Sequence, residues 1–116
     1  MHNFEKLIFW QKSVSLAKQI YIICQEIHND EKYGLVSQIK RSAISIPSNI
    51  AEGSGRNSNK EFNHFLAIAL GSAFELHTQL ILIKELHILE HEKINEIIQK
   101  VVEIEKMIYS FKNNLK

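Results

Sequence analysis

The chain has 116 residues, about the length of one domain, and its 45% of hydrophobic residues is enough for a core. Charged residues make up 23%, an ordinary globular value that argues against wholesale disorder. Four glycines and one proline are too few turn-formers for a sandwich or barrel of many short strands. The net charge of +1 is not the strongly basic balance of a dedicated nucleic-acid binder. We therefore expect one globular domain spanning residues 1–116.

The compartment is constrained by three weak signals. Cys24 is the single cysteine, so no intrachain disulfide can form, which fits a reducing compartment. The N-terminus lacks the basic region, apolar run and small-residue site of a signal peptide. Uninterrupted apolar runs are only a few residues long, against the roughly 20 that a membrane helix needs. We expect a soluble, cytoplasmic protein that does not contact membranes.

The first predicted helix has a broad apolar face. Its apolar residues form two adjacent stripes at helical spacing: Leu7, Trp10, Val14, Ala17, Tyr21 and Cys24, and Phe9, Ser13, Leu16, Ile20, Ile23 and Ile27. A single stripe suits a two-stranded seam, whereas a broad face suits a helix with neighbours on more than one side.

The second predicted helix follows the polar break at residues 28–30, where Asp30 is a plausible N-cap. Its apolar stripe consists of Leu35, Ile39, Ala43, Ile46 and Ile50, and small serines fill many other positions. Pro47 lies inside it and predicts a kink or a short break, because proline lacks an N–H and clashes with the preceding turn.

The third and fourth helices are bounded by clear signals. The Gly53-Ser54-Gly55 run ends the second helix, and Ser58-Asn59-Lys60-Glu61 is a capping box that opens the third. A connection is expected between His87 and His91. The buried stripes are Phe62, Phe65, Leu66, Ala69, Ala73, Leu76, Leu80 and Ile83, and then Ile94, Ile97, Val101, Ile104, Ile108, Phe111 and Leu115.

These segments predict four helices of about 20 to 28 residues, each about 30 to 42 Å long. Short connections make sequential neighbours antiparallel. The predicted fold is all-α, an up-down-up-down antiparallel four-helix bundle that forms a single domain.

Patterns for catalysis or metal binding are weak. His87-Ile88-Leu89-Glu90-His91 matches H-x-x-E-H, a zinc-enzyme pattern, but it falls in a predicted connection, where solvated side chains explain it equally well. Glu61-Phe62-Asn63-His64 has the spacing of di-iron bundles, yet no second copy occurs on another helix. Cys24 lies in an apolar stripe, where a buried and inert thiol is usual. We expect no catalytic residues, no metal site and no cofactor.

Cations gather in the sequence around the second helix. Lys40, Arg41, Arg56 and Lys60 are the candidates for contact with nucleic acid. Arg56 precedes a helix N-terminus, where the dipole disfavours a cation and favours an anion. The alternative is that Arg41 and Arg56 pair with Glu52 or Glu75, within the protein or across a subunit interface.

Glu75 stands on a largely apolar helix. If it is buried it needs a partner, and Arg41 or Asn49 are the natural candidates. We therefore expect a structural polar network, or a subunit interface, built from Arg41, Asn49, Glu52, Arg56 and Glu75.

Several strings together resemble a known family. They are Tyr33-Gly34-Leu35, Gln38-Ile39-Lys40-Arg41-Ser42-Ala43, Ser45-Ile46-Pro47-Ser48-Asn49-Ile50-Ala51-Glu52-Gly53, Arg56, Ser58, Phe65-Leu66, Ala69, Gly71-Ser72 and Glu75-Leu76, with Phe4, Leu7 and Trp10-Gln11-Lys12 near the N-terminus. The chain thus resembles the bacterial four-helix bundle family also called the 23S rRNA intervening-sequence protein family. The resemblance spans nearly the whole chain.

The resemblance implies an up-and-down four-helix bundle that assembles as a ring, typically a homopentamer. Some members are encoded within intervening sequences of 23S rRNA genes. A related branch, the accessory variability determinant of diversity-generating retroelements, binds a reverse transcriptase and nucleic acid through a basic surface. No catalytic residues are assigned to the family, so none is carried over. A net charge of +1 per chain gives only about +5 for a pentamer, which departs from the basic branch.

The leading hypothesis is a non-enzymatic homo-oligomeric scaffold or adaptor. The alternative is an RNA- or DNA-binding accessory protein, for example the partner of a reverse transcriptase, that uses Lys40, Arg41, Arg56 and Lys60. A metalloenzyme with His87, Glu90 and His91 is a third reading.

Overall fold

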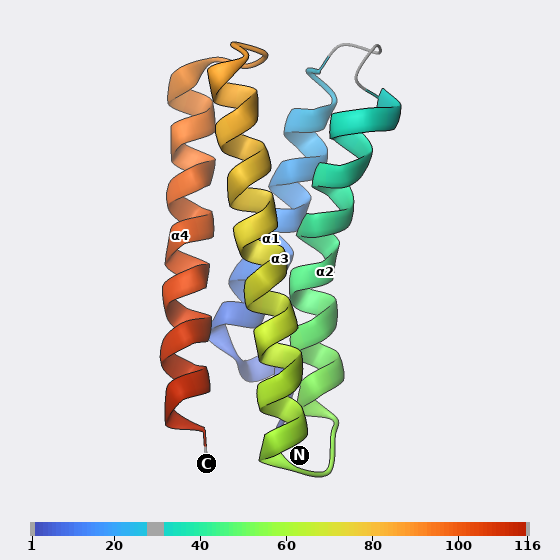
Figure 1. Ribbon diagram of the computed structural model, residues 1–116, viewed down its shortest axis with the longest axis vertical. Coiled ribbons are helices and arrows are strands. Elements are labelled where there is room, and N and C mark those ends of the chain that lie inside the picture. The colour runs from blue at the N-terminus through green and yellow to red at the C-terminus, as the bar shows by residue number, and fades with distance from the viewer. Residues whose placement is uncertain (1, 28–31, 116) are drawn as a thin grey trace.

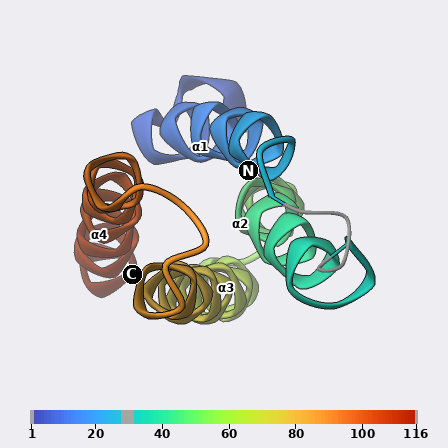
Figure 2. The same cartoon turned by 90° about the horizontal axis from the view of Figure 1, so that it is seen from above.

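The computed structural model describes residues 2–27 and 32–115, with the side chains of the second range from residue 34 onward. Helices α1 (Ile8–Cys24), α2 (Ser37–Ser54), α3 (Asn59–Glu85) and α4 (His91–Asn114) alternate in direction along a bundle of 44 × 23 × 19 Å (Figure 1). Seen along the bundle they occupy four corners, with α1 diagonally opposite α3 (Figure 2). No strand occurs in the described ranges. The predicted all-α antiparallel four-helix bundle is confirmed.

The first two helices are shorter than predicted. They have 17 and 18 residues, whereas α3 and α4 have 27 and 24. Before α1, residues Phe4–Lys6 form a separate 3-10 turn, η1, and Leu7 is extended. Before α2, residues Lys32–Val36 form a π-helical turn, η3. The predicted N-cap Asp30 lies outside the described residues.

Helix α2 runs from Ser37 to Ser54 without a break at Pro47, so the expected interruption is wrong. A proline in a helix interior removes one backbone hydrogen bond and crowds the preceding turn. The flanking residues Ile46 and Ile50 are both fully buried, so packing holds the helix on either side of the proline. Tertiary contacts outweigh the local preference here.

The predicted helix ends around residues 54–61 are confirmed. Ser54 is the last residue of α2, and Gly55 is its C-cap: the Gly55 N–H donates to the Glu52 carbonyl at 3.3 Å, and the Arg56 N–H donates to the Gly53 carbonyl at 3.1 Å. Ser58 is the N-cap of α3, where its Oγ accepts a hydrogen bond from the Glu61 backbone N–H at 3.2 Å. The sequence signals for the α2–α3 turn are therefore local and sufficient.

The core follows the predicted stripes of α2, α3 and α4 and one stripe of α1, while the other α1 stripe is fully buried only at Cys24. The stripe that includes Phe9, Leu16 and Ile20 is buried, whereas Val14 and Tyr21 of the other stripe are exposed. Buried Ser13 satisfies its hydroxyl by donating to the Trp10 carbonyl at 2.8 Å. Part of the broad apolar face of α1 thus has no neighbour within the chain.

Helix α3 is long and apolar enough, by length and composition alone, to cross a membrane. The sequence expectation, which rested on uninterrupted apolar runs, misses this because single polar residues punctuate the helix. Core helices of soluble proteins pass the same test, and eight residues of α3 are buried in the bundle. Other apolar residues of α3 lie on the side that the bundle leaves uncovered.

Candidate functional site

The α2–α3 contact carries a line of polar side chains. Residues Gln38, Ser42, Ser45 and Asn49 recur at intervals of three and four on α2, which places them along one side of the helix. Ser72 and Glu75 occupy the matching line on α3. Because the helices are antiparallel, successive residues down α2 meet successive residues up α3. We call this line of six residues the polar seam.

Glu75 is held by Ser42 and not by the partners expected from the sequence. Ser42 Oγ lies 2.7 Å from Glu75 Oε1 and 3.0 Å from the Gln38 carbonyl, so its single proton can serve one acceptor at a time. Glu75 is exposed, which corrects the expectation of a buried carboxylate that needs Arg41 or Asn49. An exposed carboxylate keeps its hydration, so no cation is required beside it.

The middle of the polar seam is a chain of three side chains. Asn49 Nδ2 donates to the Ser45 carbonyl at 2.8 Å and to Ser45 Oγ at 3.0 Å. Ser45 Oγ in turn lies 2.8 Å from Ser72 Oγ on α3. Asn49 is therefore linked to α3 through Ser45. The polar groups satisfy one another, which is what a half-buried helix contact requires.

Below the polar seam the two helices approach closely at Gly53. A Cβ added there would lie 2.6 Å from Phe65 Cβ, 3.0 Å from Phe62 Cδ1 and 3.3 Å from the Phe62 carbonyl. The contact includes backbone and a Cβ, which cannot move aside as a side-chain tip can. Glycine at position 53 is thus required by packing.

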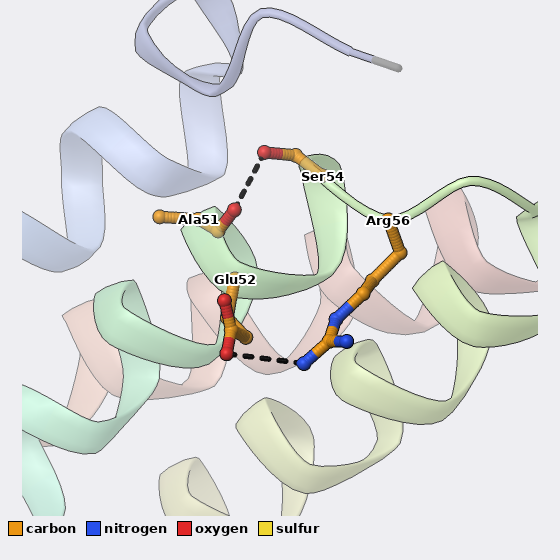
Figure 3. Close-up of polar contacts among 4 residues, drawn as sticks. All are labelled: Ala51, Glu52, Ser54 and Arg56. Carbon is orange, nitrogen blue, oxygen red and sulfur yellow. Dashed lines mark hydrogen bonds and ion pairs between the residues drawn. The ribbon is translucent and has the colours of Figure 1, made fainter.

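The α2–α3 corner holds Arg56. Its guanidinium lies 3.2 Å from Glu52 Oε1, and nearby Ser54 Oγ donates to the Ala51 carbonyl (Figure 3). The guanidinium also stacks 4.8 Å from the centre of the Phe65 ring. Glu52 and Phe65 also line a shallow open groove of about 580 Å³. The Glu52–Arg56 pair is exposed and one helical turn apart, so it contributes little to stability.

The four candidate nucleic-acid residues do not form one patch. Lys40 lies over the Tyr21 ring at 4.8 Å, toward α1, and exposed Arg41 follows it near the start of α2. Arg56 follows the opposite end of α2 and Lys60 lies in the first turn of α3, and α2 from Arg41 to its end at Ser54 spans about 20 Å. The exposed surface of α2 between the pairs presents Ile44, Ser48 and Glu52. Two separate pairs of cations result, one member of each engaged by a ring.

The histidine motifs do not assemble a metal centre in the part of the chain that the structure describes. The His87 and His91 rings stack at 5.1 Å, and no group of three or more His, Cys, Asp or Glu side chains comes together there. Glu61 belongs to the helix cap, and His64 packs edge-on to Phe65. His77 Nδ1 contacts Glu105 Oε2 at 2.7 Å, a pair between α3 and α4.

Cys24 behaves as a core residue. Its side chain is buried, and burial raises the pKa of the thiol, an effect that nearby Lys40 partly opposes. A thiol with a raised pKa is a poor nucleophile at neutral pH. No side-chain hydrogen bond among the described residues joins Cys24 or a serine hydroxyl to a histidine ring, so no nucleophile–base pair is assembled there.

The side of α3 that points away from the bundle is a second unusual feature. Its exposed residues, which we call the α3 outer face, are Ala67, Ile68, Gly71, Phe74, Glu75, Thr78, Ile81 and Leu82. Glu75 is the one charged residue among these eight, and Phe74 is 51% exposed. Scattered exposed apolar residues are ordinary, but a contiguous apolar helix face marks an interaction site.

Sequence reasoning missed most of this arrangement. Of the expected network, Glu52 and Arg56 do meet, and Asn49 and Glu75 lie on the polar seam. Arg41 forms no ion pair with Glu52 or Glu75 within the described residues. The polar seam could have been found from the matching three-and-four spacing of small polar residues on both helices. The roles of Phe65 and Gly53 needed coordinates, because they depend on which residues of α3 face α2.

Comparison with known proteins places this arrangement in a family. A solved structure of a protein with unknown function from the S23 ribosomal protein family, from Bacteroides thetaiotaomicron, is similar with a TM-score of 0.86 and 29% identity. The similarity covers 92% of this chain and 96% of that one. No curated protein matches the sequence. Residues 5–110 match the family described as 23S rRNA-intervening sequence protein. The chain therefore belongs to the 23S rRNA-intervening sequence protein family.

Proposed function

We propose that this protein is a non-enzymatic homo-oligomeric scaffold or adaptor, a pentameric ring of four-helix bundles in the cytoplasm. The observation that carries the proposal is the α3 outer face. One protomer leaves this face in water although seven of its eight residues are uncharged and four of them are large and apolar.

The energetics favour covering this face. Burial of apolar surface contributes about 25 cal/mol per Å², so Phe74, Ile81 and Leu82 together would contribute several kcal/mol when covered. The outward side of α4 has the opposite character, since it presents Glu92, Glu96, Glu103 and Lys106 among other polar residues. The contrast favours a specific protein contact on α3 over insertion of the bundle into a lipid phase, which would bury the charges of α4.

The geometry of the polar seam supports a non-catalytic role. Its hydroxyl, amide and carboxylate groups bond to one another between α2 and α3, and this joins two helices without presenting a reactive group. Such a network specifies how the helices pair. We propose that what the protein requires of its fold is the shape of the protomer and its assembly surface.

Light scattering coupled to size-exclusion chromatography tests the proposal, with absorbance at 260 and 280 nm recorded across the peak. The proposal predicts a mass of five protomers of 13.5 kDa with a protein-like ratio. A monomer at every concentration would overturn it. A nucleic-acid-like ratio that falls after a high-salt wash would instead support RNA or DNA binding through the two cation pairs, because phosphate contacts weaken steeply with salt.

A further inference from the structure

We infer that the α3 outer face packs against the outward side of α1 in a neighbouring copy, so that protomers join head to tail. The inference rests on the proposed self-assembly and names the two surfaces that carry it. We define the α1 outer face as six exposed residues: Val14, Ser15, Lys18, Tyr21, Ile22 and Gln25. Among them, the Tyr21 ring contacts Lys40 of α2.

The α1 outer face is apolar beyond what one protomer uses. Ile22 is 50% exposed, and Val14 and Tyr21 are exposed as well. Val14 and Tyr21 belong to the stripe whose member Cys24 is buried, yet both stay exposed although α1 packs against α2 and α4. Exposed apolar residues on a helix that already has its partners within the chain leave a side for a further partner.

The two faces are complementary in charge. Helix α1 contains Lys12 and Lys18 and no acidic residue. Lys12 pairs with Glu103 on α4, whereas no ion pair joins Lys18 to any residue in the described ranges. The α3 outer face has the single charge of Glu75. One lysine within an apolar face thus faces one glutamate within another, an arrangement that sets the register of an interface.

The two charges also lie at the same level of the bundle. Tyr21 touches Lys40, and Ser42, two residues further along α2, hydrogen-bonds Glu75. Lys18 precedes Tyr21 by three residues on a helix that runs the other way. At 1.5 Å per residue these offsets nearly cancel, which places Lys18 and Glu75 within about one helical turn of the same height.

Equal height matters because α1 and α3 occupy opposite corners (Figure 2). A contact between two different faces of the same protein is heterologous, and it closes into a ring only if successive copies do not climb along the axis. Pairing Lys18 with Glu75 of the next copy joins residues of equal height. The contact therefore adds no rise, as a closed ring requires.

Gly71 is a third feature that supports this contact. It lies in the middle of α3 at the centre of the outer face, and a Cβ added there would meet nothing within 4 Å. A glycine in a helix interior costs about 1 kcal/mol relative to alanine, and nothing within the protomer requires it. Beside exposed Phe74 it leaves open space for a side chain of a neighbouring helix. Val14 is the apolar residue of the α1 outer face at this height.

Complementation between two blocked variants tests the inference. Phe74→Glu blocks the α3 outer face and Ile22→Glu blocks the α1 outer face, and both side chains are half exposed, so the fold tolerates the change. We expect each variant to be monomeric by light scattering. An equimolar mixture should form a one-to-one heterodimer, because each variant retains one intact face. Ile44→Glu on the outward side of α2 is the matched control and should keep the native mass.

Other results would overturn the inference in distinguishable ways. If the unsubstituted protein is monomeric, the proposed function fails before the interface is tested. If it assembles but Ile22→Glu assembles too, the α3 outer face meets something other than α1. If both variants are monomeric and do not combine, the two faces do not pair. A circular dichroism melt of each variant confirms that it is folded.

A charge exchange tests the register independently. Lys18→Glu places two glutamates together, and we expect it to raise the concentration at which the assembly dissociates by about tenfold. Adding Glu75→Lys should restore assembly. If the double exchange dissociates as readily as Lys18→Glu alone, the two charges do not face each other.

Discussion

The two sides of α3 follow different rules. On the side toward α2, polar groups have partners across the contact and Gly53 is required because Phe65 leaves no room for a Cβ. On the outward side, apolar residues are exposed and Gly71 is required by nothing in the protomer. The side toward α2 forms a complete helix contact within one chain. The outward side has the composition of the surface that we propose to be covered by another copy.

The difference shows which surface of the bundle is a candidate for contact with a partner. A helix contact whose polar groups are paired explains how one chain folds. An apolar helix face that stays exposed indicates where the chain contacts a partner. Substitutions on the two sides of α3 test this contrast, because their effects on the free energy of unfolding should differ in sign or size.

The largest stability effect should come from Gly53→Ala. The new Cβ would overlap Phe65 Cβ at 2.6 Å and force α2 away from α3. Overpacking of this kind costs about 1–3 kcal/mol. Urea denaturation should show this loss, while the control Gly55→Ala, whose Cβ would sit 3.7 Å from the nearest atom, should show little. Equal stability of the two variants would mean that the close approach at Gly53 is not real.

Ser45→Ala should have a smaller effect on the same side. It removes the hydroxyl that joins Asn49 to Ser72, and a hydrogen bond of this kind contributes about 1 kcal/mol. Ser48→Ala, at an exposed position with no described hydrogen bond, is the control. A midpoint for Ser45→Ala that coincides with that of Ser48→Ala would show that the polar seam does not stabilise the helix pair.

Gly71→Ala should act in the opposite direction from Gly53→Ala. In the Phe74→Glu background, where assembly is blocked, it should raise the free energy of unfolding by about 1 kcal/mol, since alanine favours helix and meets open space. The same denaturation experiment measures it. A loss of stability would indicate that the outward side of α3 is already covered within one chain.

Titration of Cys24 should have the smallest effect and lies outside α3. Burial raises the pKa of this thiol above its ordinary value of 9.0 in the folded state. Below that pH the thiol is neutral in both the folded and the unfolded chain, so its ionisation does not lower the free energy of unfolding. As the pH rises past 9 the unfolded chain ionises first, and stability falls by less than about 1.4 kcal/mol per pH unit. Comparison of pH profiles with and without Cys24→Ala isolates the effect, and identical profiles would contradict it.

The fold could be predicted from the sequence because its signals are local. Helical spacing, the capping box at Ser58 and the Gly-rich end of α2 each act within a few residues, and all are found where expected. The break expected at Pro47 does not occur, because packing of Ile46 and Ile50 outweighs the local cost of a proline in a helix. Tertiary forces of that kind cannot be read from one segment.

The candidate site was only partly predictable for a related reason. The residue types of the polar seam were visible, but their partners depend on the register between α2 and α3. Glu75 drew attention as a charge on an apolar helix, yet the sequence could not tell whether that apolar character belonged to the core or to the outward side. Burial, which separates Leu76 from Phe74, decides it.

Hydroxyl-radical footprinting of the native protein, read by mass spectrometry, tests the central claim most directly. Phe74 on the α3 outer face and Tyr109 on α4 are comparably exposed in the protomer, at 51% and 59%. We predict that Phe74 is protected in the native protein and becomes reactive in the dissociated Ile22→Glu variant, while Tyr109 is modified in both. Equal modification of Phe74 in the two samples would show that the α3 outer face is open to water, and that result would contradict the account.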